Sequence, residues 1–506
     1  MEPHATQDKR SPRYRGLNGV AMATTRHWPI WLAVAVGLAL RLREYLACRS
    51  LWLDEVFLAG GIIDTPWYRL LIEPLPNNQV AAPLFVVLAK VATAALGPGE
   101  WAVRLIPFLA GCFSVVLFAR VAGRYLSPGG AFVATLLFSL SDYLIYYTTD
   151  FKPYSLDVLC TVWLLGWAVA PIDRAHSLQQ RLLLSVLLLG SFTSGLVLLG
   201  AGLYRLVRST GRSAELRALA VTGACLLPAA ALSWLLGARY AAANVFLYQY
   251  WHYAFPTIPP RTLEDLNWFV WTFRGLFEHA FDAWSYTAVG FLFIAGMVLH
   301  RHGPLLALCV LVPLAAAAAK LYPFHGRTVL FLAPVVCLAV VAALNRLGRG
   351  AIGLAAWLAA VALLTVPALV VATRYAVHPR QRAPIRLLLE RLTELDLDDG
   401  DVVTNWLGGF VYDYYRKMLP LPRRRPTSLG EWNGDRATYE EAVRTALQDR
   451  PTWFVYYGVV DWRRGPVSAV YEETRALEEA LGRTGEFRVL YRRPGAILYH
   501  WQPAGG

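Results

Sequence analysis

Apolar segments long enough to cross a membrane recur along the first three quarters of the chain. A transmembrane helix needs roughly 17 to 25 mainly apolar residues. Segments of about this length lie at 28–46, 103–119, 131–147, 155–171, 182–207, 216–236, 284–300, 304–319, 327–343 and 351–372. The pattern predicts a polytopic α-helical membrane protein rather than a series of soluble domains.

A further apolar stretch, 80–97, is better explained as a helix on the outer membrane surface. Pro83 stands near its start and Lys90 in its middle. If this stretch crossed the membrane, Arg120 and Arg124 would move to the outside, against the tendency of basic residues to stay in the cytoplasm. Because juxtamembrane amphipathic helices are a known alternative to spanning, we predict one here.

Basic residues also divide the segment 182–207. Arg181 precedes it, and Arg205 and Arg208 lie at its other end, so both flanks should lie inside. We therefore expect two short helices that turn near 191–195. About eleven crossings follow, in the inner or plasma membrane, with the N-terminus in the cytoplasm and the C-terminus outside it.

After residue 374 the pattern changes to that of a small soluble domain. The segments DVVTNWL and TWFVYYGVV are typical of strands, YEEAVRTALQ and ETRALEEALGR of helices, and EFRVLYRR with AILYHW of a hairpin around Pro494–Gly495. We predict a disordered basic lead at 1–27, a transmembrane domain at 28–374 and a small α/β extracytoplasmic domain at 375–506.

The composition supports this division. Of all residues 56% are hydrophobic and 16% are charged, whereas soluble domains have about 25% charged residues. Residues 375–506 contain 19 Lys and Arg against 18 Asp and Glu, so nearly all of the net charge of +13 belongs to the rest of the chain. Nucleic-acid binding would need basic residues clustered on a soluble face. The charge therefore indicates topology, and we expect no nucleic-acid partner.

Two acids that are unusual for their surroundings follow the first predicted helix. Asp54 and Glu55 stand inside an apolar sequence, LWLDEVF. Carboxylates at a membrane surface are costly unless they coordinate a metal, titrate or pair. Both are therefore candidate catalytic residues; the alternative is a pair of solvated loop acids with Arg49 as a partner.

Cations accompany these acids on the predicted outer face. Asp150 and Lys152 stand at a second helix boundary. They could form a surface ion pair that caps a helix, or they could be a functional acid and a cation that binds phosphate. His325 and Arg327 precede a late helix; Arg327 suits a bidentate phosphate contact or a snorkelling role, and His325 a ligand contact or a plain interfacial position. Carboxylate plus cation can deprotonate a hydroxyl while stabilising a departing phosphate.

The loop at 238–283 adds many aromatic side chains to the same face. Aromatic residues at this density commonly form a belt at the membrane interface. Stacking on a sugar ring or a prenyl chain is the other interpretation.

The order and spacing of these motifs resemble the GT-C superfamily of membrane glycosyltransferases, in the group similar to protein O-mannosyltransferases and the lipid A aminoarabinose transferase. The matching stretches are LWLDE at 51–55, NQVAAPLFVVLAK at 78–90, WAVRLIPFLAG at 101–111, LIYYTTDFKPYSLDVL at 144–159 and FHGRTVLFLAP at 324–334. The resemblance implies a GT-C-like fold with juxtamembrane helices in the first outer loop. It also implies hexosyl or pentosyl transfer from a polyprenyl-phosphate sugar, usually with inversion, to a glycan, lipid or protein acceptor.

The resemblance further implies roles for single residues. Asp54 matches the essential acid of the first loop, a general base or, in some branches, a metal ligand. Asp150 and Lys152 match the acid of the second loop and a basic residue near the donor phosphate, and Arg327 matches the basic position that holds the leaving phosphate. We predict that the catalytic residues are Asp54, Glu55 and Asp150, and that the substrate-binding residues are Gln79, Lys90, Lys152, Tyr154, His325 and Arg327. No cofactor is assigned, and a divalent metal, if present, would be held by Asp54 and Asp150.

Two other functions are compatible with parts of the sequence. A transporter or flippase of lipid-linked saccharides would need ionisable residues near the bilayer midplane and repeat symmetry. A catalytically inactive scaffold, whose outer domain binds a partner, is the third possibility. The unusual charges crowd one face of the membrane instead, which favours an enzyme.

Overall fold

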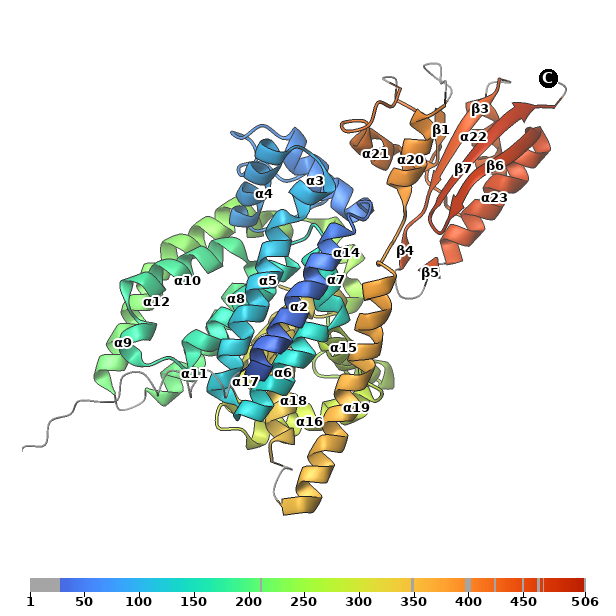
Figure 1. Cartoon of the computed structure of the whole chain (residues 1–506). Coiled ribbons are helices and arrows are strands. Elements are labelled where there is room, and N and C mark those ends of the chain that lie inside the picture. Colours follow the sequence, from blue (N-terminus) through green and yellow to red (C-terminus); the bar gives the residue numbers. More distant parts are fainter. Residues whose placement is uncertain are drawn as a thin grey trace, which may run out of the picture.

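The computed structural model describes residues 28–209, 212–346, 350–395, 402–422, 425–447, 450–461, 465–466 and 468–504, so the predicted basic lead lies outside the described residues. A bundle of helices forms the larger part of the molecule. A small α/β domain stands at one end of this bundle and follows the long helix α19 in the chain (Figure 1).

Most helices of the bundle coincide with predicted apolar segments; the exception is the 18-residue helix Leu263–Ala280, which lies in the predicted loop 238–283. They are α2 (Trp28–Leu46), α5 (Glu100–Tyr125), α6 (Pro128–Leu140), α7 (Asp142–Thr148), α8 (Tyr154–Ala168), α10 (Leu178–Gly190), α11 (Phe192–Arg208), α12 (Ser213–Ser233), α15 (Leu263–Ala280), α16 (Tyr286–Leu299), α17 (Gly303–Ala318), α18 (Ala333–Leu344) and α19 (Gly350–Val377). Short helical pieces join them: α9 (Ile172–Ala175), η1 (Trp234–Ala238), α13 (Arg239–Ala242), α14 (Val245–Tyr250), η2 (His252–Ala254) and η3 (Gly326–Leu332). All 12 residues of α18 are buried, so this helix lies at the centre of the bundle core.

The predicted division of 182–207 is confirmed. Helices α10 and α11 are separated by Ser191, whose hydroxyl oxygen caps α11 by accepting a hydrogen bond from the Ser194 N–H. A serine in this position satisfies one of the N–H groups that have no partner inside a helix.

Four helices in the described part of the chain are long and apolar enough to cross a membrane. They are Glu100–Tyr125, Ser213–Ala242, Gly326–Leu344 and Ala351–Val377. Helices α6 and α7 pass the same test together, with a bend of 55° between them, and would make a fifth span. Several shorter apolar helices accompany them, and the number of eleven crossings stays a prediction.

Two helices between α2 and α5, α3 (Leu53–Asp64) and α4 (Pro83–Leu96), lie together at the end of the bundle that faces the α/β domain (Figure 1). Pro83 suits the first turn of α4, because its ring fixes a helical φ and it has no N–H to leave unpaired. Gly97, at a φ of 87°, ends the helix. With 14 residues α4 is as short as other apolar helices in predicted spans, such as α16, so its place on the membrane surface stays a prediction.

The α/β domain contains a five-stranded mixed sheet in the order β2-β1-β3-β7-β6. Its strands are β1 (Val402–Thr404), β2 (Thr427–Ser428), β3 (Thr452–Tyr457), β6 (Gly485–Arg493) and β7 (Ala496–Pro503), and a separate pair is formed by β4 (Val460–Asp461) and β5 (Gly465–Pro466). Strand β1 is parallel to β2 and β3, whereas β7 is antiparallel to β3 and β6. The predicted hairpin at Pro494–Gly495 is present, and β3 occupies most of the predicted strand 452–460. Of the predicted strand 401–407 only Val402–Thr404 is extended, because Asn405 caps a helix that begins at Trp406.

The two faces of this sheet have different neighbours. Side chains alternate along a strand, so Val403 joins a core with α22 (Arg436–Leu447) and α23 (Ser468–Thr484), while Val402 joins a core with α20 (Ile385–Thr393) and α21 (Trp406–Tyr415). The second core continues into α3 and α4 and includes Leu58 and Phe85. The α/β domain is therefore docked on α3 and α4.

Candidate active site

Asp54 lies in the first turn of α3, at the end of the bundle that carries the α/β domain. The turn is closed by Glu55, whose carboxylate accepts a hydrogen bond from the Trp52 N–H at 3.2 Å. Arg327 donates a hydrogen bond of 2.7 Å from Nη2 to Oδ2 of Asp54, and the Lys152 ammonium lies 3.7 Å from Oδ1. The Asp54 side chain is 23% exposed, so these three predicted residues meet where a substrate has access.

Three cations keep Asp54 ionised. Burial alone would raise the pKa of its carboxyl group, but the charges of Lys152, Arg327 and Arg382 outweigh burial and hold that pKa below its usual value. Asp54 can therefore accept a proton at neutral pH.

Lys152 stands in the short segment between α7 and α8. Its ammonium donates a hydrogen bond of 2.5 Å to Oε1 of Gln79, and only 9% of the side chain is exposed. Burial lowers the pKa of Lys152, and the Asp54 charge opposes that effect. The structure thus brings Gln79 and Lys152, both predicted to bind substrate, to the same point beside Asp54.

Aromatic rings surround Arg327. Its guanidinium carbon lies 5.4 Å from the centre of the Trp52 ring and 5.8 Å from that of Trp251, distances at which cation–π attraction operates. Trp251 belongs to the aromatic loop at 238–283, so this loop contributes at least one wall of the candidate site.

Glu55 lies behind Asp54 and is fully buried. Arg104 donates hydrogen bonds of 2.8 and 2.6 Å to its two carboxylate oxygens, and the Phe151 N–H donates another at 2.7 Å. Burial would raise the pKa of Glu55, but Arg104 and Arg49 lower it below the usual value. These contacts tie α3 to α5 and to the segment after α7, a position that favours support over the catalytic role expected from the sequence.

Asp150 is also fully buried. It accepts a hydrogen bond of 2.7 Å from the Trp52 indole N–H and pairs with Arg49 at 3.4 Å. Arg49 also lies 3.8 Å from the Glu55 carboxylate, the partnership with an LWLDE acid that the sequence suggested. Burial, followed by the nearby Glu55 charge, raises the pKa of Asp150. Asp150 therefore orients Trp52, which in turn lines the site.

The other predicted substrate-binding residues have different surroundings. Lys90 donates three hydrogen bonds of 2.8 to 2.9 Å to the carbonyl groups of Ile62, Ile63 and Thr65, where it caps the C-terminal end of α3. This occupies its ammonium away from Asp54, so Lys90 is not part of the cluster. The Tyr154 ring packs edge to face on Tyr147 at 5.1 Å.

His325 lies two residues before Arg327. Its Nδ1 is 3.4 Å from the Thr272 hydroxyl, and its ring meets Tyr253 edge to face at 5.3 Å. Burial lowers the pKa of His325, so the imidazole is neutral at neutral pH. In the structure it supports the aromatic wall, through its contacts with Thr272 and Tyr253.

Sequence reasoning missed Arg382. This residue lies between α19 and α20, and its guanidinium carbon is 3.8 Å from the centre of the Trp52 ring. Its neighbours in the sequence are those of an ordinary charged linker. Only the docking of the α/β domain brings it to the site.

The two candidate metal ligands do not fit a divalent cation. Asp54 faces Lys152 and Arg327, and Asp150 faces Arg49, so a metal ion between them would lie beside cations that repel it. Within the described ranges, no group of three or more His, Cys, Asp or Glu side chains could hold a metal ion. We assign no step to a metal.

Comparisons with known proteins agree with this arrangement at the level of the fold. No family model matches the chain, and no curated protein sequence is significantly similar to it. The crystal structure of ArnT from Cupriavidus metallidurans in the apo state is similar over 95% of this chain and 98% of its own, with a TM-score of 0.54 and 14% identity. The same protein bound to undecaprenyl phosphate gives a TM-score of 0.53 and 13% identity over 96% and 98% of the two chains.

The Archaeoglobus fulgidus oligosaccharyltransferase in the apo form is also similar to this chain. Its TM-score is 0.50 at 12% identity, over 92% of this chain and 79% of that one. Identities this low establish a common fold and leave the substrates open. The chain is therefore a helical membrane protein with the GT-C fold of these transferases.

Proposed function

We propose that this protein is a glycosyltransferase that moves a hexose or pentose from a polyprenyl-phosphate donor to an acceptor hydroxyl outside the cytoplasm. The observation that carries the proposal is the position of the Asp54 carboxylate, 2.7 Å from Arg327 and 3.7 Å from Lys152. A base and two anion-binding groups converge at one accessible point.

Lys152 and Arg327 suit the donor phosphate. With Asp54 they form a group of two positive charges and one negative charge, which leaves one positive charge to attract an anion. Arginine binds phosphate oxygens in a planar fork, and lysine binds them as a point charge. One protein of the same fold is bound to undecaprenyl phosphate, which supports a lipid phosphate as the ligand.

Asp54 suits the general base. Binding of the phosphate to Lys152 and Arg327 draws these cations away from Asp54, and the loss of their attraction raises its affinity for a proton. The acceptor hydroxyl then gives its proton to Asp54 while its oxygen forms a bond to the anomeric carbon. The bond from that carbon to the phosphate oxygen breaks, and the electron pair leaves with the phosphate.

The two cations stabilise the charge that develops on this phosphate. Such groups act strongly because they are held in place before the reaction, as Lys152 is by Gln79 and Arg327 by its two tryptophan neighbours. Attack opposite the leaving phosphate would invert the anomeric carbon.

The location of the charges also bears on the rival transport function. Asp54 belongs to α3, at the end of the bundle that carries α4 and the α/β domain (Figure 1). Lys152 lies 3.7 Å from its carboxylate, and Arg382 lies over the ring of the neighbouring Trp52. A transporter would need its ionisable groups near the bilayer midplane. We therefore place the reaction at the extracytoplasmic surface, with the α/β domain on that side.

The test compares Asp54→Asn with Asp64→Asn, a matched control on the same helix whose carboxylate is 61% exposed and pairs with Lys417. Mass spectrometry would measure sugars on envelope glycans, lipids and proteins in cells with each variant. Binding of undecaprenyl phosphate to the purified proteins would be measured in parallel. We expect Asp54→Asn to abolish transfer and retain binding, and Asp64→Asn to retain both.

Full transfer by Asp54→Asn would remove the general-base role. Unchanged glycans in cells that lack the protein, together with movement of lipid-linked sugar across vesicles, would favour a flippase instead.

A further inference from the structure

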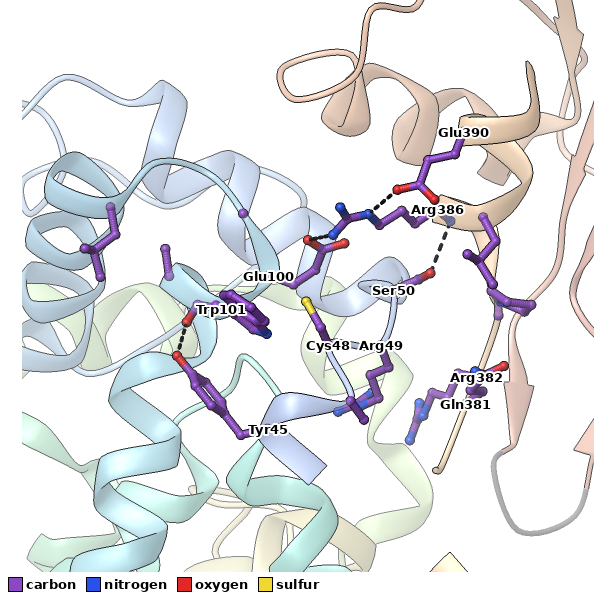
Figure 2. Close-up of a pocket in the computed structure, with 17 residues that line it drawn as sticks. Tyr45, Cys48, Arg49, Ser50, Glu100, Trp101, Gln381, Arg382, Arg386 and Glu390 are labelled. Carbon is purple, nitrogen blue, oxygen red and sulfur yellow. Dashed lines mark hydrogen bonds and ion pairs between the residues drawn. The ribbon is translucent and has the colours of Figure 1, made fainter. Parts of the chain in front are cut away.

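A cavity of about 770 Å³ opens beside the candidate active site. It lies between the segment that follows α2, the first turn of α5 and the segment 381–390 that leads into the α/β domain (Figure 2). Its wall includes Arg49 and Arg382, which also contact the Tyr146 and Trp52 rings near Asp150. The cavity is therefore a neighbour of the Asp54 cluster but does not contain Asp54, Lys152 or Arg327.

Two of the three arginines in this wall are neutralised. Arg386 pairs with Glu100 and Glu390, each at 2.8 Å (Figure 2). Arg49 pairs with Asp150 at 3.4 Å on the buried side of the wall.

Arg382 is different. Its Nε is buried without a hydrogen-bond partner, and no carboxylate of the described residues forms an ion pair with it. Its contacts are with aromatic rings, that of Trp52 at 3.8 Å and that of Tyr146 at 5.3 Å. The carboxylates of Asp150 and Asp54 act on this charge without forming an ion pair with it, so the open Nε–H of Arg382 can still bind an anion.

The rim of the cavity is apolar and exposed. Leu96 is 63% exposed, Trp101 is 53% exposed and Leu387 is 51% exposed. Trp101 stands in the first turn of α5, which is one of the candidate spans, so the rim lies at the level of a membrane surface. Tryptophan at a span end is typical of the headgroup region.

We propose that this cavity binds the acidic headgroup of a membrane lipid, with its phosphate on Arg382 and its chains against the apolar rim. The chemistry is that of a phosphate attached to hydrocarbon. A free phosphate could satisfy Arg382 but would leave Leu96 and Trp101 in contact with solvent. The binding itself does not depend on the proposed transfer reaction.

A lipid bound at this site would change the proton affinity of the Asp54 carboxylate. The positive charge of Arg382 is one of those that lower the pKa of Asp54. An acidic headgroup on Arg382 would offset this charge and raise the proton affinity of Asp54. This consequence rests on the proposed function, whereas the lipid site does not.

The test uses the full chain in nanodiscs of phosphatidylcholine with and without phosphatidylglycerol, and native mass spectrometry to count retained lipids. The variants are Arg382→Gln and the control Arg391→Gln, which removes an arginine on α20 that is 68% exposed and pairs with Glu394. We expect wild type and Arg391→Gln to retain phosphatidylglycerol, and Arg382→Gln to bind it roughly tenfold more weakly through loss of a charged hydrogen bond. Binding of undecaprenyl phosphate, measured in parallel, should be the same in wild type and Arg391→Gln.

A second variant, Leu387→Trp, fills the cavity from its exposed rim without removing a charge. It should also reduce phosphatidylglycerol retention, and thermal unfolding of each protein shows whether the fold is kept. Equal retention by wild type and both cavity variants would overturn the proposal. Displacement of the lipid by inorganic phosphate alone would reduce the site to one for free anions, and loss of undecaprenyl phosphate from Arg382→Gln would show that the cavity belongs to the donor site.

Discussion

The Tyr457 hydroxyl, at the end of β3 in the α/β domain, accepts a hydrogen bond of 2.9 Å from the Leu53 backbone N–H, one residue before Asp54. The Tyr415 hydroxyl accepts another, of 2.8 Å, from the Leu51 N–H. The first N–H groups of a helix have no partner inside it, so Tyr457 satisfies a group that α3 leaves open. The α/β domain thus holds both backbone positions that flank Trp52, and it is part of the site's frame.

Tyr457→Phe should therefore impair transfer more than it impairs folding. The change leaves the Leu53 N–H without its acceptor at a cost of about 1–3 kcal/mol, concentrated at the start of α3. Transfer in membranes and thermal unfolding of purified protein measure the two effects. The control is Tyr471→Phe, because Tyr471 lies in the same domain and is 62% exposed; equal transfer by the two variants would contradict a positioning role for Tyr457.

The pH dependence of transfer should differ between free enzyme and donor complex. In the free protein the pKa of Asp54 is held below its ordinary value of 3.8, so the carboxylate is ionised across the physiological range. The ion pair with Arg327 stabilises the fold above that ordinary value, and this contribution is lost only as the pH falls through the lowered pKa. Bound phosphate competes for Arg327 and Lys152 and should raise the pKa.

The acid limb of kcat reports the enzyme–substrate complex, whereas that of kcat/KM reports the free enzyme. We therefore expect the limb of kcat to lie at higher pH than the limb of kcat/KM. Steady-state kinetics over a pH series would measure both. Coincident limbs would show that the donor phosphate does not draw the cations from Asp54.

Much of the fold can be predicted from the sequence, because a membrane span needs an unbroken apolar run and such runs are local. Asp54, Lys152 and Arg327 can be identified for a similar reason, since each stands at a helix boundary in apolar surroundings. Arg382 cannot, because an arginine in a charged linker is ordinary until docking brings it to Trp52. Lys90 is predicted to bind substrate because it lies in a matching motif, but the structure does not place it at Asp54. Its ammonium is hydrogen-bonded to three carbonyl groups at the C-terminal end of α3.

The contrast between Lys90 and Lys152 can be tested directly. Lys152→Met should weaken binding of undecaprenyl phosphate by roughly tenfold, because a charged hydrogen bond is lost. Lys90→Met should leave that affinity unchanged and lower the thermal stability, since the end of α3 loses its cap. Equilibrium binding in detergent and thermal unfolding give the two readouts, and an equal loss of affinity in both variants would return Lys90 to the donor site.

The variant Glu55→Gln tests whether the second acid of the LWLDE motif stabilises the site or takes part in catalysis. Removing one partner of a buried ion pair leaves Arg104 uncompensated, which should cost about 3–5 kcal/mol. The matched control, Glu73→Gln, breaks an exposed pair with Arg69 and should change the stability little, because solvent screens such a pair. Removing both partners, in Glu55→Gln with Arg104→Gln, should recover part of the stability because no charge is left unpaired. If Glu55 supports the site, transfer per folded molecule should follow stability and recover with it. A catalytic Glu55 would instead leave transfer abolished in the double variant, even at low temperature where the protein stays folded.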